Sequence, residues 1–243
     1  MNGSFTTDAI VLRRAEWRDY DRMVTLFTPL YGRVDAVARG CRKPKSPLLN
    51  AAEPFTCGEY QIVSAHDRLT VSQCRITESF FELRQDYERL THGAYWLKLL
   101  EEIVVPDEPN EALFQMTLKA LTYLTHSELA PSLVTAMFEM QLWRIAGFSP
   151  NMESCVVCGA SAEKTPLCFD ARKGGCVCAL CAPGAKHLSE GARRILMKAP
   201  RTRFEAAEKL VSHPDWLEAA ARIREFTFAR LGHEVKNAPE TKN

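Results

Sequence analysis

The sequence lacks several features that would assign the protein to a particular class. The 243-residue chain contains no run of about 18 apolar residues, so no transmembrane helix and no membrane partner are expected. Residues 1–14 lack the basic segment and apolar stretch of a secretory signal, and we therefore expect a cytoplasmic protein. Neither sign of charge dominates, because 31 lysines and arginines stand against 30 aspartates and glutamates. This balance argues against a uniformly basic, histone-like protein.

Sequence patterns of common catalytic and nucleotide-binding sites are also missing. There is no G-x-x-x-x-G-K-[ST] phosphate loop, no G-x-G-x-x-G fingerprint and no G-x-S-x-G nucleophile turn. His233 and Glu234 begin an H-E-x-x-H zinc-protease pattern, but Asn237 stands where the second histidine is required. The sequence therefore predicts no enzyme active site and no bound nucleotide.

Two kinds of hydrophobic periodicity divide the chain. The first 80 residues contain five short segments rich in β-branched and aromatic residues and separated by turn signals, which predicts a small five-stranded OB-fold barrel. From about residue 80, apolar residues recur every three or four positions, which predicts helices. The expected strand segments are residues 9–13, 23–28, 32–40, 58–63 and 69–76.

Polar residues mark the expected helix starts. Asn110, Ser132 and Ser189 precede periodic apolar segments and are predicted N-caps, while Ser212 with Pro214 is expected to open the last helix. We predict an α+β protein whose helical region carries an inserted zinc element. Its expected parts are an OB-fold domain (1–80), a first helical part (81–150), a zinc-binding element (151–186), a second helical part (187–235) and a tail (236–243).

Cysteine is abundant, with nine residues, six of them between positions 155 and 181. Cys155-Val-Val-Cys158 and Cys178-Ala-Leu-Cys181 are two C-x-x-C pairs with 19 residues between them, a spacing typical of a four-thiolate zinc site. Four thiolates leave no open coordination position, so we expect one structural Zn²⁺ ion on Cys155, Cys158, Cys178 and Cys181. Cys168 and Cys176 are alternative ligands for the second pair. Free buried cysteines or a redox dithiol are the other interpretations.

Positive charge concentrates near the N-terminus. Residues 1–50 carry nine lysines and arginines against five acids, with most of the excess in residues 33–45. A strand is expected to end near Gly40 and to lead into a loop of small and basic residues. Backbone phosphates can approach such a loop closely, and its cations release counterions when they bind nucleic acid. An ordinary solvated loop is the alternative interpretation.

Several segments, in their order and spacing, resemble the bacterial RecO family of recombination mediator and DNA repair proteins over nearly the whole chain. They include Thr25-Leu-Phe-Thr28 followed by Tyr31-Gly32-Arg33, and then Ala38-Arg39-Gly40-Cys-Arg42. Further segments are Leu142-Trp-Arg-Ile-Ala-Gly147-Phe-Ser-Pro150 and Cys155-Val-Val-Cys158-Gly159.

The resemblance implies an OB-fold, a helical C-terminal region and, in many members, a four-cysteine zinc element. It implies binding to single- and double-stranded DNA and annealing of complementary strands. With the partner RecR, such proteins help load RecA onto strands coated by single-strand-binding protein (SSB), and they bind the acidic C-terminal tail of SSB. They act in the cytoplasm at the nucleoid, without enzymatic activity. A zinc-ribbon transcription or RNA-binding factor without annealing activity is the alternative function, and a metalloenzyme would need an open metal position.

The resemblance also assigns expected site residues. The DNA contacts expected on the basic strand and loop are Arg33, Arg39, Arg42, Lys43 and Lys45, with Arg13 and Arg14 as second choices. A basic patch in the helical region either extends the DNA surface, meets an acidic tail or is a solvated helix face; it comprises Arg193, Arg194, Lys198, Arg201 and Arg203. Candidate base-stacking aromatics, which we expect to be core residues instead, are Phe27, Tyr31, Phe55 and Tyr60.

Overall fold

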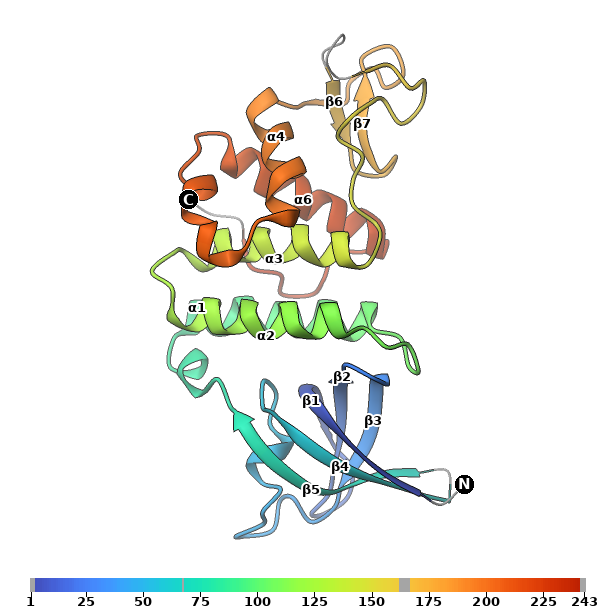
Figure 1. Cartoon of the computed structure of the whole chain (residues 1–243), viewed down its shortest axis with the longest axis vertical. Helices are drawn as coiled ribbons and strands as arrows, with labels where there is room; N and C mark the ends of the chain where they lie inside the picture. The colour runs from blue at the N-terminus through green and yellow to red at the C-terminus, as the bar shows by residue number, and fades with distance from the viewer. Residues whose placement is uncertain (1–2, 67, 162–166, 241–243) are drawn as a thin grey trace. The chain divides into compact units, whose positions relative to one another are not determined.

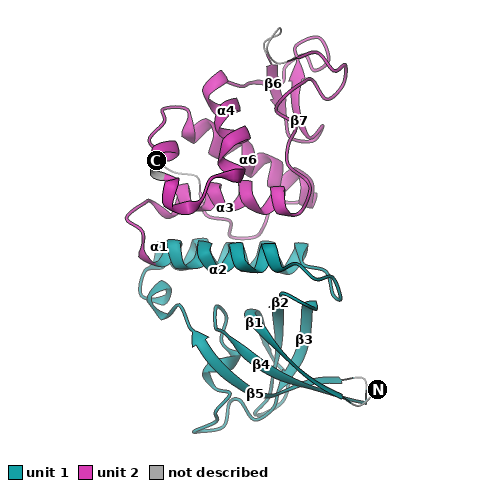
Figure 2. Ribbon diagram, in the orientation of Figure 1, with its two compact units in different colours: residues 1–125 teal, residues 126–243 magenta. Residues whose placement is uncertain are grey.

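The computed structural model describes residues 3–66, 68–161 and 167–240 of the chain. The chain folds into two compact units, residues 1–125 and residues 126–243 (Figure 2). The first unit contains a β-barrel and two helices, and the second contains further helices and a small sheet (Figure 1). No helix in the described ranges is both long and apolar enough to cross a membrane. The five-part division expected from the sequence stays a prediction.

Five strands form the barrel: β1 (Gly3–Glu16), β2 (Arg22–Thr28), β3 (Gly32–Ala38), β4 (Cys57–Ala65) and β5 (Arg68–Glu78). Their order is β1-β2-β3-β5-β4, and β4 pairs with β1 to close the ring. The β3–β5 pairing is parallel and the other pairings are antiparallel. This closed Greek-key order is that of an OB-fold, so the predicted five-stranded barrel and α+β class are confirmed.

Alternating residues of the strands fill the barrel. Val11, Val24, Leu26 and Ile62 are buried in one cluster, as the period of two along a strand requires. Strand β2 is also buried on its outer side, because Phe27 contacts Phe114 of a helix at 5.4 Å between ring centroids. A strand covered on both sides reads as a continuous apolar run, which explains the Met23–Thr28 sequence.

Two helices complete the first unit, α1 (Tyr87–Ile103) and α2 (Glu111–His126). The Asn110 side chain accepts a hydrogen bond from the Leu113 N–H at 2.9 Å, so the predicted N-cap of α2 is confirmed. The segment between the helices passes close to Gly32, where a Cβ atom would overlap the carbonyl of Val105. Glycine is therefore required at this position, which also has φ +60°.

The second unit contains α3 (Pro131–Ile145), α4 (Glu190–Lys198), α5 (Glu208–Val211) and α6 (Trp216–Leu231). Its small sheet has the order β7-β6-β8, with strands Leu167–Asp170 (β6), Gly175–Cys178 (β7) and Lys186–His187 (β8). Trp143 of α3 joins α6 through its indole N–H, which donates to the Thr227 hydroxyl at 2.8 Å. Short 3₁₀ helices lie at Asn50–Ala52, Phe81–Arg84, Ala199–Arg201 and Phe204–Ala206.

Helix starts in the second unit follow the sequence signals in part. Ser189 caps α4 as predicted, accepting from the Ala192 N–H at 3.1 Å. The prediction for Ser132 is wrong, because α3 begins at Pro131, whose fixed φ suits the first helical position, and Ser132 is buried inside the first turn. Ser212 also lies too early, since Asp215 directly precedes α6.

Candidate metal centre and nucleic-acid interface

Two similar tight turns carry the paired cysteines. In the first, the Gly159 N–H donates to the Cys155 carbonyl at 2.9 Å, and Gly159 adopts φ +75° so that the chain folds back toward the sulfurs. In the second, which follows β7, the Cys181 N–H donates to the Cys178 carbonyl at 3.0 Å. Each turn therefore presents two sulfur atoms to the same side.

Strand β7 fixes the position of the first turn relative to the second. The Cys176 carbonyl accepts from the Val156 N–H at 2.9 Å, and the Cys176 N–H donates to the Asn151 carbonyl at 2.8 Å. At Gly175, a Cβ atom would overlap the Asn151 backbone, and φ is +151°. The close approach of these backbones therefore depends on glycine. The backbone hydrogen bonds of Cys176 then align the two cysteine turns.

The sulfur atoms of Cys155, Cys158, Cys178 and Cys181 all lie within 4.8 Å of one another. The Sγ atoms of Cys158 and Cys178 are 3.8 Å apart. Tetrahedral zinc with Zn–S bonds of about 2.3 Å requires sulfur–sulfur distances of about 3.8 Å. The cluster can therefore hold a metal ion.

The two alternative cysteines stand outside this cluster. Cys176 is fully buried, and its Sγ lies 3.8 Å from the Met152 sulfur. Burial raises the pKa of the Cys176 thiol to about 11, so it stays protonated near neutral pH. Cys168 lies on β6, opposite Val177, and is not among the four clustered cysteines.

The cluster favours a cation electrostatically. Backbone N–H groups of Cys158 and Cys178 donate to the Cys155 sulfur and lower the pKa of that thiol to about 6. Hydrogen bonds between the Cys181 thiol and the sulfurs of Cys178 and Cys158 favour the protonated form and raise the pKa of Cys181 to about 12. A divalent ion would replace the thiol protons and would allow all four cysteines to ionise.

A second candidate site is the basic loop, defined as residues 39–45, which follows β3. Buried Cys41 anchors the loop in the barrel core, and Leu48 anchors the segment after it. Arg39, Lys43 and Lys45 are exposed, and no ion pair of theirs occurs within the described ranges. Because no acid occurs between residues 36 and 52, the loop is a concentrated positive surface.

The other predicted DNA contacts are engaged within the barrel unit. Arg33 is half-buried, and its Nη1 donates to the Glu101 carbonyl at 3.0 Å. Arg13 pairs with the Glu101 carboxylate at 2.6 Å. Ion pairs also join Arg14 to Glu53 and Arg42 to Glu16. All seven predicted residues lie in the barrel unit, and their contact with DNA stays a prediction.

Two exposed aromatic residues of the first unit are not among the residues predicted from the sequence. The turn between β1 and β2 carries Trp17 and Tyr20, both largely exposed and close to the basic loop. The predicted stacking candidates are instead core residues, as expected: Phe27, Phe55 and Tyr60 are buried, and Tyr31 packs half-buried on the barrel. The signal in the sequence is a pair of aromatic residues that are separated and flanked by charged residues in a predicted turn.

The predicted basic patch of the second unit is partly neutralised. Glu190 accepts hydrogen bonds from Arg193 and Arg194, which lower its pKa to about 2. Arg193 also donates to the Met152 carbonyl at 2.8 Å, so it supports the segment leading to the cysteine turns. The exposed cations of the patch outside this network are Lys198, Arg201 and Arg203.

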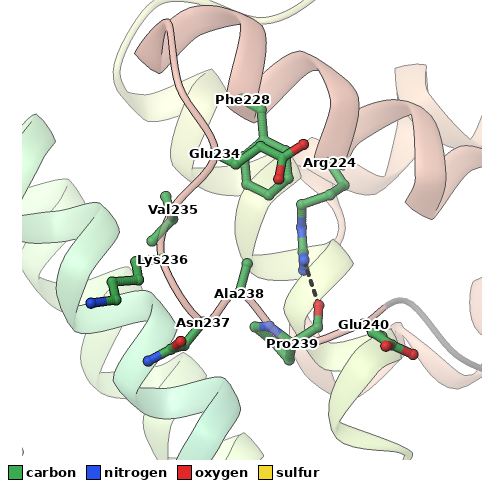
Figure 3. A pocket seen from close by; sticks show the side chains of 9 residues that line it. All are labelled: Arg224, Phe228, Glu234, Val235, Lys236, Asn237, Ala238, Pro239 and Glu240. Atoms are coloured by element: carbon green, nitrogen blue, oxygen red, sulfur yellow. Dashed lines mark hydrogen bonds between the residues drawn. The ribbon is translucent and has the colours of Figure 1, made fainter.

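A cleft between α6 and the C-terminal segment does not present free cations as the basic loop does (Figure 3). Arg224 and Phe228 line it together with residues 234–240. The Arg224 guanidinium is already engaged: its Nε donates to the buried Glu139 carboxylate at 2.6 Å, and its Nη1 donates to the Pro239 carbonyl at 2.7 Å. We assign no function to this end of the chain.

Comparison with known proteins matches both parts of the sequence to one family. Residues 1–80 match the model for the recombination protein O N terminal, and residues 84–239 match the model for the recombination protein O C terminal. The chain is 31% identical over 236 residues to the DNA repair protein RecO of Desulforamulus reducens, covering 96% of this chain and 91% of that protein. It is 32% identical over 228 residues to the DNA repair protein RecO of an Anaeromyxobacter species, covering 93% and 89%. The DNA repair protein RecO of Acetivibrio thermocellus is 31% identical over 193 residues, with 78% and 76% covered.

Proposed function

This chain belongs to the RecO family of recombination and DNA repair proteins, and from that premise we propose that it is a non-enzymatic recombination mediator. It binds single- and double-stranded DNA and anneals complementary strands. With RecR it helps load RecA onto single strands coated by SSB, and it contacts the acidic C-terminal tail of SSB.

The observation that carries the proposal is the basic loop. Its cations Arg39, Lys43 and Lys45 stand exposed on a segment anchored by buried Cys41. A rigid loop loses little conformational entropy when it binds, and solvated cations that lack a protein carboxylate are free to exchange counterions for phosphates. Such a loop beside an OB-fold barrel is suited to the backbone of a single strand.

Annealing by this surface requires no bond making or breaking by the protein. Two nucleic-acid strands repel each other through their phosphates, and cations that neutralise one backbone lower this repulsion. Contacts to phosphates leave the base edges available for pairing. This mechanism is consistent with a sequence that carries no nucleotide-binding motif.

The four-cysteine cluster has a structural role in this proposal, with Zn²⁺ as its metal. Four sulfur ligands leave no position for a reacting water molecule. A bound ion would join the first cysteine turn to the turn that follows β7, and so would stabilise an element whose described strands are only two to four residues long. A zinc-ribbon transcription or RNA-binding factor would account for these cysteines, but the family match covers both units of this chain.

Titration of a fluorescently labelled single-stranded oligonucleotide at several salt concentrations tests the proposal. Four to six phosphate contacts give a slope of log affinity against log salt of about −3 to −4, and we expect a value in this range. The control is the same chain with Arg39, Lys43 and Lys45 replaced by alanine. Absence of binding by the unmodified protein at low salt would refute the proposal.

A further inference from the structure

The turn between β1 and β2 combines exposure, aromaticity and rigidity. Trp17 is 46% exposed and Tyr20 is 53% exposed, so two large rings face solvent within one short turn. We propose that Trp17 and Tyr20 form a stacking platform for unpaired nucleobases, placed beside the basic loop that holds the phosphates. This inference rests on the proposed function and identifies the part of the site that distinguishes single strands from duplexes.

Hydrogen bonds hold the aromatic turn against the basic loop. The Arg42 N–H donates to the Tyr20 carbonyl at 3.0 Å, and the Gly40 N–H donates to the Asp21 carboxylate at 2.7 Å. Within the turn, the Trp17 N–H donates to the Asp21 carbonyl at 3.2 Å. The backbone that carries both rings is therefore fixed relative to the loop, and the platform is largely formed before a ligand arrives.

The charge around the rings is mixed: Asp19 and Asp21 lie in the turn and Glu16 pairs with Arg42, while the basic loop brings further cations to the same place. The Lys43 ammonium lies 5.7 Å from the centre of the Tyr20 ring, and the backbone contacts place Arg42 at the same turn. When a base stacks on one of these rings, the phosphate of the same nucleotide can reach the cations of the basic loop. Single-strand binding sites that tolerate any sequence combine aromatic rings and cations in this way. An apolar protein partner would instead be expected to meet further apolar side chains, but residues 16–22 are otherwise all charged.

The platform has a consequence for the choice of substrate. Bases in a duplex are already stacked and paired, so they cannot lie flat on Trp17 or Tyr20 without being unstacked, which costs free energy. Phosphates of both single strands and duplexes can reach the basic loop. We therefore expect the cations to set the overall affinity for DNA and the two aromatics to set the preference for unpaired DNA.

Intrinsic fluorescence provides a direct test, because the other three tryptophans are at most 4% exposed. Oligodeoxythymidylate is titrated into the full chain, and we expect quenching of the exposed Trp17. An abasic strand of equal length and charge serves as the matched probe. It should bind about fivefold or more weakly and quench less, because stacking contributes that factor or more for each base.

Variants separate base stacking by the two rings from other effects of substitution on DNA binding. Trp17→Ala with Tyr20→Ala should weaken binding to oligodeoxythymidylate about fivefold or more and leave affinity for the abasic strand unchanged. Trp17→Phe retains a ring and should keep most of the affinity while abolishing the quenching. Tyr87→Ala removes a ring that is 85% exposed elsewhere in the same unit and should change nothing.

The outcomes distinguish this inference from the proposed function. If the unmodified chain binds neither strand at low salt, the proposed function itself fails. If it binds both strands equally, and the double variant binds as the unmodified chain does, the stacking platform is overturned while the DNA-binding function stands. Circular dichroism checks that each variant is folded.

Discussion

Single alanine substitutions of the predicted DNA-contact residues should separate those that hold phosphates from those that hold the fold. Arg39, Lys43 and Lys45 are exposed and have no ion pair in the part of the chain that the structure describes. Arg33 is half-buried and donates to the Glu101 carbonyl. Loss of one phosphate contact to single-stranded DNA reduces the magnitude of the salt slope by about 0.7. We expect that reduction for each of the three loop residues.

The combined effect is large enough to measure easily. From a slope of about −3.5, the triple variant should fall to about −1.4. Between about 50 and 200 mM salt the unmodified chain would then lose affinity roughly 100-fold, and the triple variant only roughly 10-fold. Fluorescence anisotropy of a labelled single strand gives both values from the same titrations.

Arg33→Ala is the informative contrast. The salt slope of DNA binding by this variant should equal that of the unmodified chain. Its free energy of unfolding should fall by about 2 kcal/mol, because a charge-assisted hydrogen bond to the Glu101 carbonyl is lost. This division of roles is refuted if Arg33→Ala reduces the magnitude of the salt slope as much as the loop variants do, or if the loop variants leave the salt slope unchanged.

Three further predictions concern the second unit. Cys178→Ser should abolish zinc binding and the four-sulfur spectrum of the cobalt-substituted protein, whereas Cys176→Ser should retain both. Metal analysis of protein purified without chelator measures the bound zinc, and equal loss of zinc in the two variants would reject the ligand assignment. Metal affinity should fall as pH is lowered, because protons compete for thiolates, and Cys155, with a metal-free pKa of about 6, should be the last to protonate; an affinity independent of pH would contradict this. Arg224→Met leaves the fully buried Glu139 carboxylate without its cation and should lower the free energy of unfolding by about 3–5 kcal/mol. Arg194→Met removes an exposed ion pair and should lower it by less than about 1 kcal/mol. Equal losses of stability in denaturant unfolding would show that burial does not set the contribution of these ion pairs.

The barrel and most helices could be predicted from the sequence because their signals are local. Strands β1–β5 fall on the five expected segments, although β3 ends at Ala38 and not at the expected residue 40, and Asn110 and Ser189 make the expected caps. The N-cap prediction for Ser132 is wrong because Pro131, one residue earlier, is an equally good first residue of a helix. The strands β6–β8 were not predicted, since two to four residues among cysteines and glycines give no periodic signal.

The candidate sites were predictable to different degrees. Paired spacing is a local property, and it predicted the four cysteines whose sulfurs the fold brings together. Exposure of the basic residues is not local: Arg33 is engaged by Glu101, which lies 68 residues away in the sequence. The same limit applies to Trp17 and Tyr20, whose exposure depends on a turn that hydrogen bonds hold against the basic loop.

Strand annealing is the activity that most directly tests the proposed mediator function. Two complementary oligonucleotides, labelled as a fluorescence donor and acceptor, are mixed with and without the protein in the absence of any nucleotide. We expect the unmodified chain to accelerate the rise in energy transfer. The triple variant with alanine at Arg39, Lys43 and Lys45 should accelerate it much less. If the protein binds the strands but leaves the annealing rate at its spontaneous value, the mediator function proposed for this chain is contradicted.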